Sequence, residues 1–347
     1  MMDFKKYTDI SIEKTVELLG IDSPTGFTSN AALWTKNEFE ALGFSAKLTN
    51  KGGVIVDLGG EDCSDALLLY AHIDTLGGIV SEIKGNGRLK LSKLGGIHPS
   101  GAEFENVKVY TRDGKTYGGT FMLCNPSVHV NGDYDSTKRS FDTMEVVLDE
   151  DVSSSCDTRA LGIENGDIVC FDPRTVVTPS GYIKSRFLDD KLAVGMVLGL
   201  ANYLKDNSIT PKRKIYAHIT VYEEIGHGGS ASVPEGVTEG LAIDMGCVGS
   251  GLLGSERKVS ICAKDSSGPY SYEMTTKLIN SAKQSGADYA VDVYPYYGSD
   301  VEATLRGGYD IRHGLIGAGV FASHGYERSH RDGVLNTLKL LFNYIEI

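Results

Sequence analysis

Clustered cysteines are missing from this chain. Its 347 residues include only six cysteines, and none of them forms a Cys-x-x-Cys pair. Closely spaced cysteine pairs are typical of thiolate zinc sites, and dense cysteines are typical of disulfide scaffolds, so neither kind of site is expected. Scattered free thiols favour a reducing compartment, and we therefore expect a cytoplasmic protein.

Positive charge and long apolar runs are also scarce. The chain has 34 Lys and Arg against 46 Asp and Glu, a net charge of −12. This balance disfavours sequence-independent binding to nucleic acid or to an anionic membrane surface. The longest uncharged stretch, residues 192–204, is too short to span a bilayer. We predict neither a nucleic-acid partner nor a membrane partner.

The hydrophobic pattern predicts an interrupted α/β domain. Residues 11–42 show helical periodicity, and residues 66–71 are apolar on both faces, as in a central strand covered by helices. Short strands without clear helices fill residues 77–173, and helices and strands alternate again from residue 174. We predict a mixed-sheet α/β catalytic domain, residues 1–76 and 174–347, interrupted by an inserted β-rich domain, residues 77–173.

Polar side chains follow the predicted strands. His72 ends the first buried strand, and Asp74 lies two residues later, where its side chain can orient the imidazole ring while the ring binds a metal. A His-x-Asp pair is common by chance, and a polar strand end with a solvated aspartate is the favoured explanation unless the rest of the chain supports a site. The pair therefore needs support from elsewhere in the chain.

Three further carboxylate positions supply that support. Asp189 and Asp190 precede a helix, where capping the helix is as good an explanation as binding a cation. Glu223 and Glu224 follow an apolar strand, and Asp244 follows another. Ligands bind at the carboxyl ends of strands in open α/β sheets, so these carboxylates are candidate ligands and proton carriers.

Histidine is available near the end of the chain. His324 and His330 both precede the predicted last helix, and we choose His330 as the ligand while His324 remains an alternative. Nitrogen and carboxylate oxygen together suit zinc or another divalent first-row ion.

The ordered set His-x-Asp, Asp-Asp, Glu-Glu, Asp, His resembles the dinuclear metallo-aminopeptidases. This family includes glutamyl aminopeptidase, deblocking aminopeptidase and the tetrahedral aminopeptidases, and some members are described as endoglucanase-like. The resemblance covers nearly the whole chain and implies a zinc-peptidase-like catalytic domain. It also implies homo-oligomers, from dimers formed through the inserted domain up to dodecamers.

The resemblance implies a role for each candidate residue. His72 and Asp244 would hold one metal, Glu224 and His330 the other, and Asp189 would bridge the two ions. The cofactors would be two divalent ions per subunit, zinc most simply, with cobalt as an alternative.

The catalytic residues would be Glu223 as general base and Asp74 as the residue that orients His72. The reaction would remove the N-terminal residue of a peptide with a free N-terminus, through a metal-bridging water. Alternatives are a related deacylase or carboxypeptidase, and a non-catalytic assembly protein of the same fold.

Overall fold

The fold is that of a computed structural model, which describes residues 3–347. The chain divides into two compact units, one formed by the residues up to Asp74 together with Arg174–Ile347, the other by Thr75–Pro173. The second unit begins two residues earlier than the predicted insertion and ends at the same residue. Within the described residues no helix is long and apolar enough to cross a membrane.

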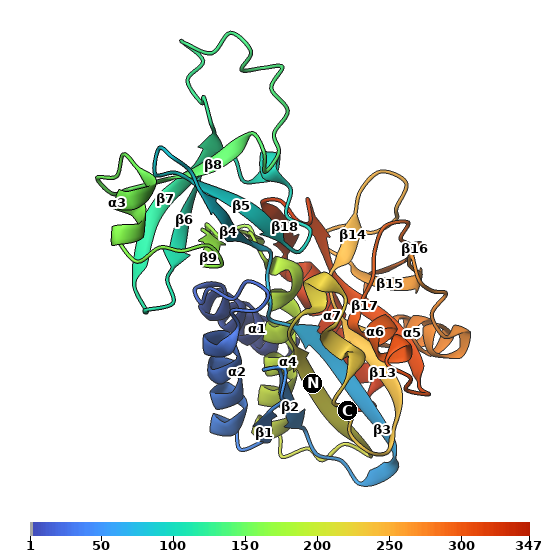
Figure 1. Cartoon of the computed structure of the whole chain (residues 1–347). Helices are drawn as coiled ribbons and strands as arrows, with labels where there is room; N and C mark the ends of the chain where they lie inside the picture. The colour runs from blue at the N-terminus through green and yellow to red at the C-terminus, as the bar shows by residue number, and fades with distance from the viewer. Residues whose placement is uncertain (1–2) are drawn as a thin grey trace. The chain divides into compact units, whose positions relative to one another are not determined.

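The first unit is built on a twelve-stranded sheet (Figure 1). Its strands are β1 (Ser45–Leu48), β2 (Val54–Asp57), β3 (Asp62–His72), β10 (Val176–Val177), β11 (Tyr182–Ser185), β12 (Arg213–Thr220), β13 (Val237–Ile243), β14 (Gly246–Val248), β15 (Val259–Lys264), β16 (Tyr289–Val293), β17 (Arg312–Phe321) and β18 (Glu327–His330). The main path of the sheet runs β1-β2-β12-β3-β13-β17-β18-β11-β10. The sheet is mixed: β3 is parallel to both β12 and β13, whereas β2 runs antiparallel to β12.

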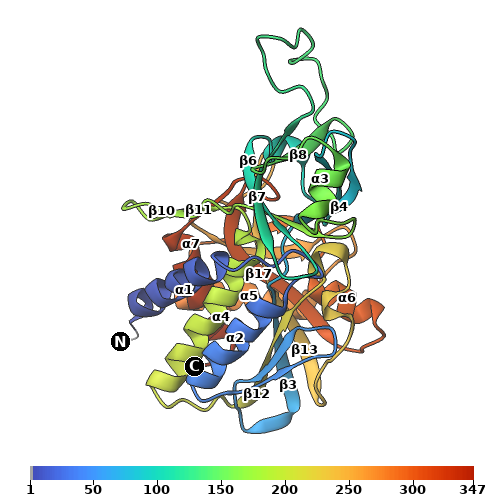
Figure 2. The same cartoon turned by 60° about the vertical axis from the view of Figure 1, so that its left-hand side comes forward.

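Helices cover both faces of the central strands. They are α1 (Phe4–Leu19), α2 (Ser29–Ala41), α4 (Leu188–Asp206), α5 (Tyr272–Ser285), α6 (Asp300–Arg306) and α7 (Arg331–Tyr344), with the 3-10 turns η2 (Glu223–Ile225) and η3 (Gly228–Ser230). Figure 2 shows α1, α2 and α4 on one side of β3, β12 and β13, and α6 on the other. Burial on both faces explains why residues 66–72 of β3 are all buried.

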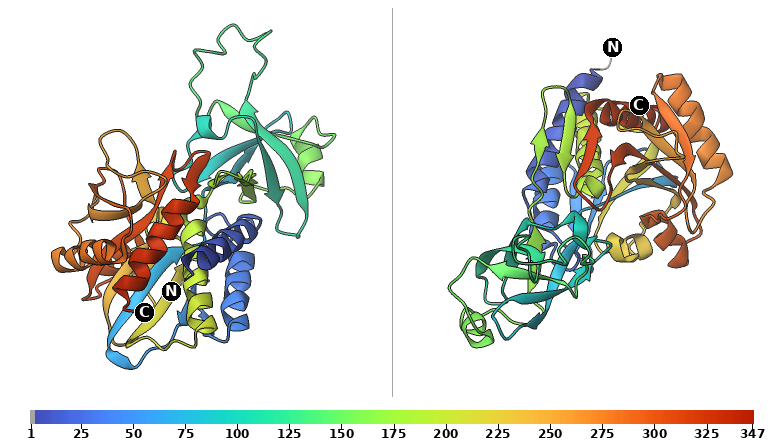
Figure 3. Two further views of the ribbon diagram at one scale, coloured as in Figure 1. Left: turned by 180° about the vertical axis from the view of Figure 1, so that it is seen from behind. Right: turned by 90° about the horizontal axis from the view of Figure 1, so that it is seen from above.

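The second unit is a closed six-stranded barrel of order β4-β5-β8-β7-β6-β9. Its elements are β4 (Gly77–Ile83), β5 (Leu89–Leu94), η1 (Pro99–Gly101), β6 (Glu105–Tyr110), β7 (Thr116–Leu123), β8 (Met144–Leu148), α3 (Ser155–Ala160) and β9 (Ile168–Phe171). A tight turn with Gly114 at φ +86° joins β6 to β7, at the place where the sequence predicts a hairpin. Figure 3 shows the long loop between β7 and β8 extending away from the barrel.

Candidate active site

Parallel pairing brings three strand ends to one edge of the large sheet. His72 is the last residue of β3 and lies opposite Thr220, the last residue of β12. Glu223 and Glu224 follow β12 in η2, and Asp244 directly follows β13, the other neighbour of β3. The carboxyl ends of parallel strands share an edge, so side chains from distant parts of the sequence meet there.

His72 is buried, and its ring orientation is fixed. Its Nδ1 lies 2.9 Å from the main-chain oxygen of Asp74, and its Nε2 lies 3.2 Å from Asp189 Oδ1. A carbonyl oxygen only accepts hydrogen bonds, so Nδ1 carries the proton and Nε2 is left as the ligand atom. The main-chain carbonyl therefore makes the close contact that was expected of the Asp74 carboxylate, whose nearest approach to Nδ1 is 3.7 Å.

The buried carboxylate of Asp74 holds the turn that follows β12. It accepts hydrogen bonds from the Thr25 hydroxyl at 2.7 Å and from the main-chain N–H groups of Glu223 at 3.1 Å and Glu224 at 3.4 Å. Asp74 thus orients the two glutamates rather than the imidazole alone.

Asp189 lies between two histidines. Its Oδ1 faces His72 Nε2, and its Oδ2 lies 3.5 Å from His324 Nε2. Burial acts to raise the pKa of Asp189, but the contacts with His324 and His72 outweigh burial and lower it. A carboxylate that presents one oxygen to each side has the arrangement a bridging ligand needs.

The structure places His330 away from this cluster and brings in His324 instead. His330 lies opposite Tyr182 in the β11–β18 pairing and caps α7: its Nδ1 accepts the Asp332 N–H at 3.0 Å, and its Nε2 lies 2.9 Å from the Ser180 carbonyl. Both ring nitrogens are therefore used. His324, in the turn before β18, lies 3.6 Å from Glu224 Oε2, so the structure brings the alternative, His324, and not the chosen His330, to the carboxylates.

Glu327 supports the site and was missed by the sequence analysis. Its buried carboxylate accepts the N–H groups of Asp189 at 3.1 Å and His324 at 2.9 Å. Burial, reinforced by the charge of Asp189, raises the pKa of Glu327 to about 8. A single glutamate in a polar segment gives no spacing signal, so only the tertiary structure identifies it.

The concentration of buried carboxyl groups calls for a cation. Burial, together with the charge of Asp189, raises the pKa of Asp244 to about 7, and burial raises those of Glu223 and Glu224 well above their ordinary value. Glu224 Oε1 is buried and has no hydrogen-bond partner among the described residues. Buried acidic oxygens without partners are costly unless a positive ion neutralises them.

Two overlapping groups of side chains have ligand atoms within 4.8 Å of one another. One group is His72, Asp190 and Asp244, and the other is His72, Asp189 and Glu224. Asp190 Oδ2 also accepts the main-chain N–H of His72 at 3.1 Å, which fixes the end of β3. The donor set is nitrogen and carboxylate oxygen, and it fits a divalent first-row metal.

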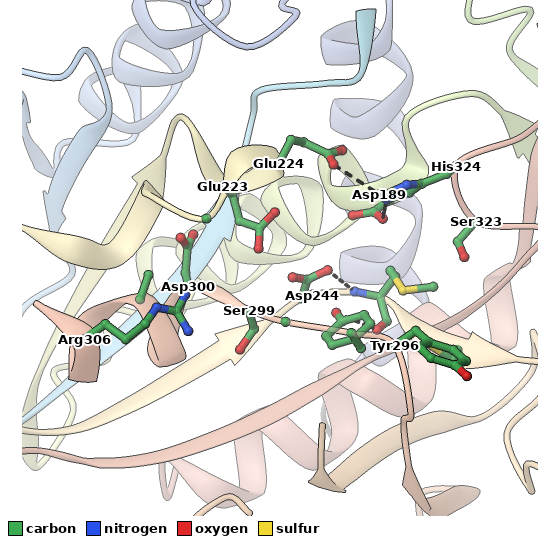
Figure 4. A pocket seen from close by; sticks show the side chains of 16 residues that line it. Asp189, Glu223, Glu224, Asp244, Tyr296, Ser299, Asp300, Arg306, Ser323 and His324 are labelled. Atoms are coloured by element: carbon green, nitrogen blue, oxygen red, sulfur yellow. Dashed lines mark hydrogen bonds and ion pairs between the residues drawn. The ribbon is translucent and has the colours of Figure 1, made fainter. Parts of the chain in front are cut away.

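A cavity of about 420 Å³ opens beside these carboxylates (Figure 4). Its walls include Tyr296, Ser299, Asp300 and Arg306, all close to or within α6. Asp300 is buried and bound to the Gly229 N–H and to the Thr220 hydroxyl, whereas Arg306 is exposed. The cavity can therefore take a small substrate next to the acidic cluster.

Comparison with known proteins identifies the family. Residues 52–340 match the family model described as M42 glutamyl aminopeptidase. The chain belongs to this M42 peptidase family. YhfE of Bacillus subtilis (strain 168) is 42% identical over 340 residues, which cover 97% of this chain and 98% of that protein.

Solved peptidase structures share the fold. An aminopeptidase from Desulfurococcus kamchatkensis superimposes with a TM-score of 0.86 at 21% identity, covering 98% of this chain and 95% of that one. The Pyrococcus horikoshii TET1 peptidase gives a TM-score of 0.84 at 23% identity, covering 96% and 98%. The M42 family is one of metal-dependent aminopeptidases, and this chain is accordingly a hydrolase that acts on the N-terminal end of peptides.

Proposed function

We propose that the acidic cluster holds two divalent metal ions. His72 and Asp244 would bind one ion, Glu224 and His324 the other, and Asp189 would bridge them. The unpartnered Glu224 oxygen and the position of Asp189 between two histidines carry this proposal. Zinc suits this donor set best and cobalt is the alternative. Bound there, the ions would polarise the scissile carbonyl and acidify a water molecule.

Glu223 is the proposed general base. Its Oε2 lies 3.6 Å from His72 Nε2, and the side chain lines the cavity beside the proposed ligands. Glu223 would take a proton from the attacking water at a carboxylate oxygen and deliver it to the leaving amine. Asp74 accepts the main-chain N–H of Glu223 and so fixes the start of the turn that carries the proposed base.

Arg306 favours substrates whose N-terminal residue is acidic. Its one hydrogen bond among the described residues goes to the Ser267 hydroxyl at 3.5 Å, and no described carboxylate forms an ion pair with it. Figure 4 shows Arg306 among the side chains that line the cavity. A guanidinium without an acidic partner can bind the side-chain carboxylate of a peptide. Two relatives, each 24% identical, are named glutamyl aminopeptidase in Lactococcus lactis and lysyl aminopeptidase in Pyrococcus furiosus, so the preference is argued from Arg306 and not from these names.

A substrate panel with defined metals tests the proposal. Purified protein is stripped with a chelator, its metal content is measured, and zinc or cobalt is added back. We expect hydrolysis of free aminoacyl substrates to disappear and return, with Glu and Asp substrates cleaved fastest. Cleavage of N-blocked peptides instead would indicate a deacylase or carboxypeptidase, and absence of both metal and turnover would indicate an assembly protein.

We also propose a cytoplasmic homo-oligomer. The Pyrococcus horikoshii TET1 peptidase assembles into a tetrahedron or an octahedral shell, and the 75–173 barrel is the candidate contact unit here. All six cysteines are free and three are exposed, as expected in a reducing compartment. Light scattering of purified protein, with and without residues 124–143, would give the size of the assembly.

A further inference from the structure

The loop that follows Glu223 and Glu224 is held by a lysine from a distant hairpin. The ammonium of Lys51 donates to the main-chain oxygens of His227 at 2.5 Å and Gly228 at 2.7 Å, and to the Ser230 hydroxyl at 3.2 Å. These three contacts use all three N–H donors of the ammonium group. One side chain therefore fixes most of residues 227–230.

Acidic and hydroxyl groups hold the same loop from other directions. Asp300 Oδ1 accepts the Gly229 N–H at 2.6 Å, and the Thr304 hydroxyl donates to the Gly229 oxygen at 2.8 Å. Upstream, Asp74 accepts the N–H groups of Glu223 and Glu224. Hydrogen bonds therefore hold the chain both at the two glutamates and at residues 227–230, which follow them. Among the described contacts to residues 227–230, Lys51 is the one cation.

The hairpin that carries Lys51 is itself well defined. The Thr49 N–H donates to the Gly53 oxygen at 2.8 Å, and the Gly53 N–H donates to the Thr49 hydroxyl at 3.0 Å. A Cβ atom at Gly53 would lie 2.8 Å from the Ile219 oxygen, so the turn sits close against β12. Lys51 therefore reaches the loop from a fixed position.

We propose that Lys51 is a positioning residue that keeps Glu223 and Glu224 in their working geometry by holding residues 227–230. The proposal rests on the function assigned above to these glutamates. Without the ammonium, the Gly228 oxygen loses the donor described for it and the His227 oxygen keeps only the Ser230 hydroxyl. The loop after the glutamates would then be held less firmly, by the contacts to Gly229 alone on its far side. Nothing in this role requires Lys51 to touch the substrate.

Hydrogen exchange on metal-free protein tests the loop directly. We expect Lys51→Met to speed amide exchange in residues 223–230 by about tenfold or more while α4 and β3 keep their protection. Lys51→Arg, which retains N–H donors, should restore part of the protection. Lys36→Met, which removes a surface ion pair with Glu40, is the matched control and should leave residues 223–230 unchanged. Unchanged loop exchange in Lys51→Met, or an equal rise everywhere, would overturn the proposal.

Steady-state kinetics then test the catalytic consequence. Lys51→Ala should lower kcat by about 10- to 100-fold with little change in KM, the range seen when groups supporting a metal site are removed. Added propylammonium should recover part of kcat, whereas tetramethylammonium, which cannot donate a hydrogen bond, should not. A change confined to KM, or recovery by both salts, contradicts the role. Exchange is measured without metal or substrate, so it tests Lys51 even if the wild-type protein proves not to cleave peptides.

Discussion

At the scale of single residues, the hydrogen bonds of each histidine decide which of its ring nitrogens is left to bind a metal. His72 presents Nε2 because its Nδ1 is bound to the Asp74 carbonyl, and His330 presents neither nitrogen because both are bound elsewhere. The Nε2 atom of His324 faces the carboxylates of Asp189 and Glu224. Residue type alone does not indicate which of His324 and His330 can face the carboxylates, whereas the contacts of their ring nitrogens do.

Replacing each histidine in turn tests this assignment. His324→Ala should reduce the metal content from two ions to about one and lower kcat/KM by roughly 100-fold or more, because a metal ion contributes several kcal/mol to catalysis. His330→Ala should keep both ions and lose about 2–4 kcal/mol of stability, because a buried ring that caps α7 and bonds the Ser180 carbonyl is removed. Metal analysis and urea unfolding measure the two effects, and the reverse pattern would restore His330 as the ligand.

The general base can be removed while the shape of its side chain is kept. Glu223→Gln should retain metal and fold, yet lose about 10²- to 10⁴-fold in kcat, because an amide cannot accept the proton of the attacking water. Metal content and circular dichroism are the controls for an intact site. Substantial turnover in a variant with full metal content would mean that another group moves the proton.

At the scale of elements, the strand ends place the ligands and the helices fix the strands. Helix α4 carries Asp189 at its first turn and packs against α1 at Gly195 and Gly199. A Cβ at Gly199 would lie 2.1 Å from the Ser11 hydroxyl oxygen and 3.0 Å from the Tyr7 carbonyl oxygen. The close approach of the two helices therefore depends on the missing side chain.

Gly199→Ala should destabilise the protein although alanine favours helix. We expect a loss of about 1–3 kcal/mol from overpacking, larger than the gain of about 1 kcal/mol from helix propensity. Adding Ser11→Ala should recover part of the loss by removing the closest atom. Gly249→Ala, where a Cβ meets nothing within 4 Å, is the control and should leave urea unfolding unchanged. Equal stability of Gly199→Ala and wild type would show that α1 shifts freely.

At the scale of the whole molecule, stability in acid depends on a buried ion cluster at the other end of the sheet. Glu239, near the start of β13, is 1% exposed and contacts Arg213 at 2.6 Å, Arg312 at 3.0 Å and Tyr344 at 2.8 Å. Burial acts to raise the pKa of Glu239, but Arg213 and its neighbours lower it from 4.5 to about 2. The folded state therefore binds this proton less readily than the unfolded chain.

The stability that Glu239 provides should be complete above about pH 4.5 and lost as the pH falls toward 2. Glu239→Gln should cost about 3 kcal/mol at pH 7, the usual result of removing one partner of a buried ion pair, and distinctly less at pH 3.5. Urea unfolding of metal-free protein at both pH values measures this, and the surface variant Glu346→Gln is the control. A cost independent of pH would contradict the lowered pKa.

The sequence by itself determined the architecture of the catalytic unit and predicted most of the polar residues that the structure brings together at the sheet edge. The apolar runs that end at His72, before Glu223 and at Asp244 are signals of buried parallel strands, and parallel strands must bring their carboxyl ends to one edge. Because each of these strand ends carries a polar group of the site, the order of those groups along the chain was enough to indicate the family. The edges of the inserted unit were predicted to within two residues because its short strands lack helical periodicity.

Only the tertiary structure decided the contacts that local pattern does not encode. They include the position of His324 beside Glu224, the hydrogen bonds of Glu327 and Lys51, and the hydrogen bond between Asp74 and the turn that carries the glutamates. All of them join segments far apart in sequence. Such contacts arise from the register of strands and the path of turns. Periodicity reports which face of an element is buried, but it does not report which atom of a neighbouring element will be found there.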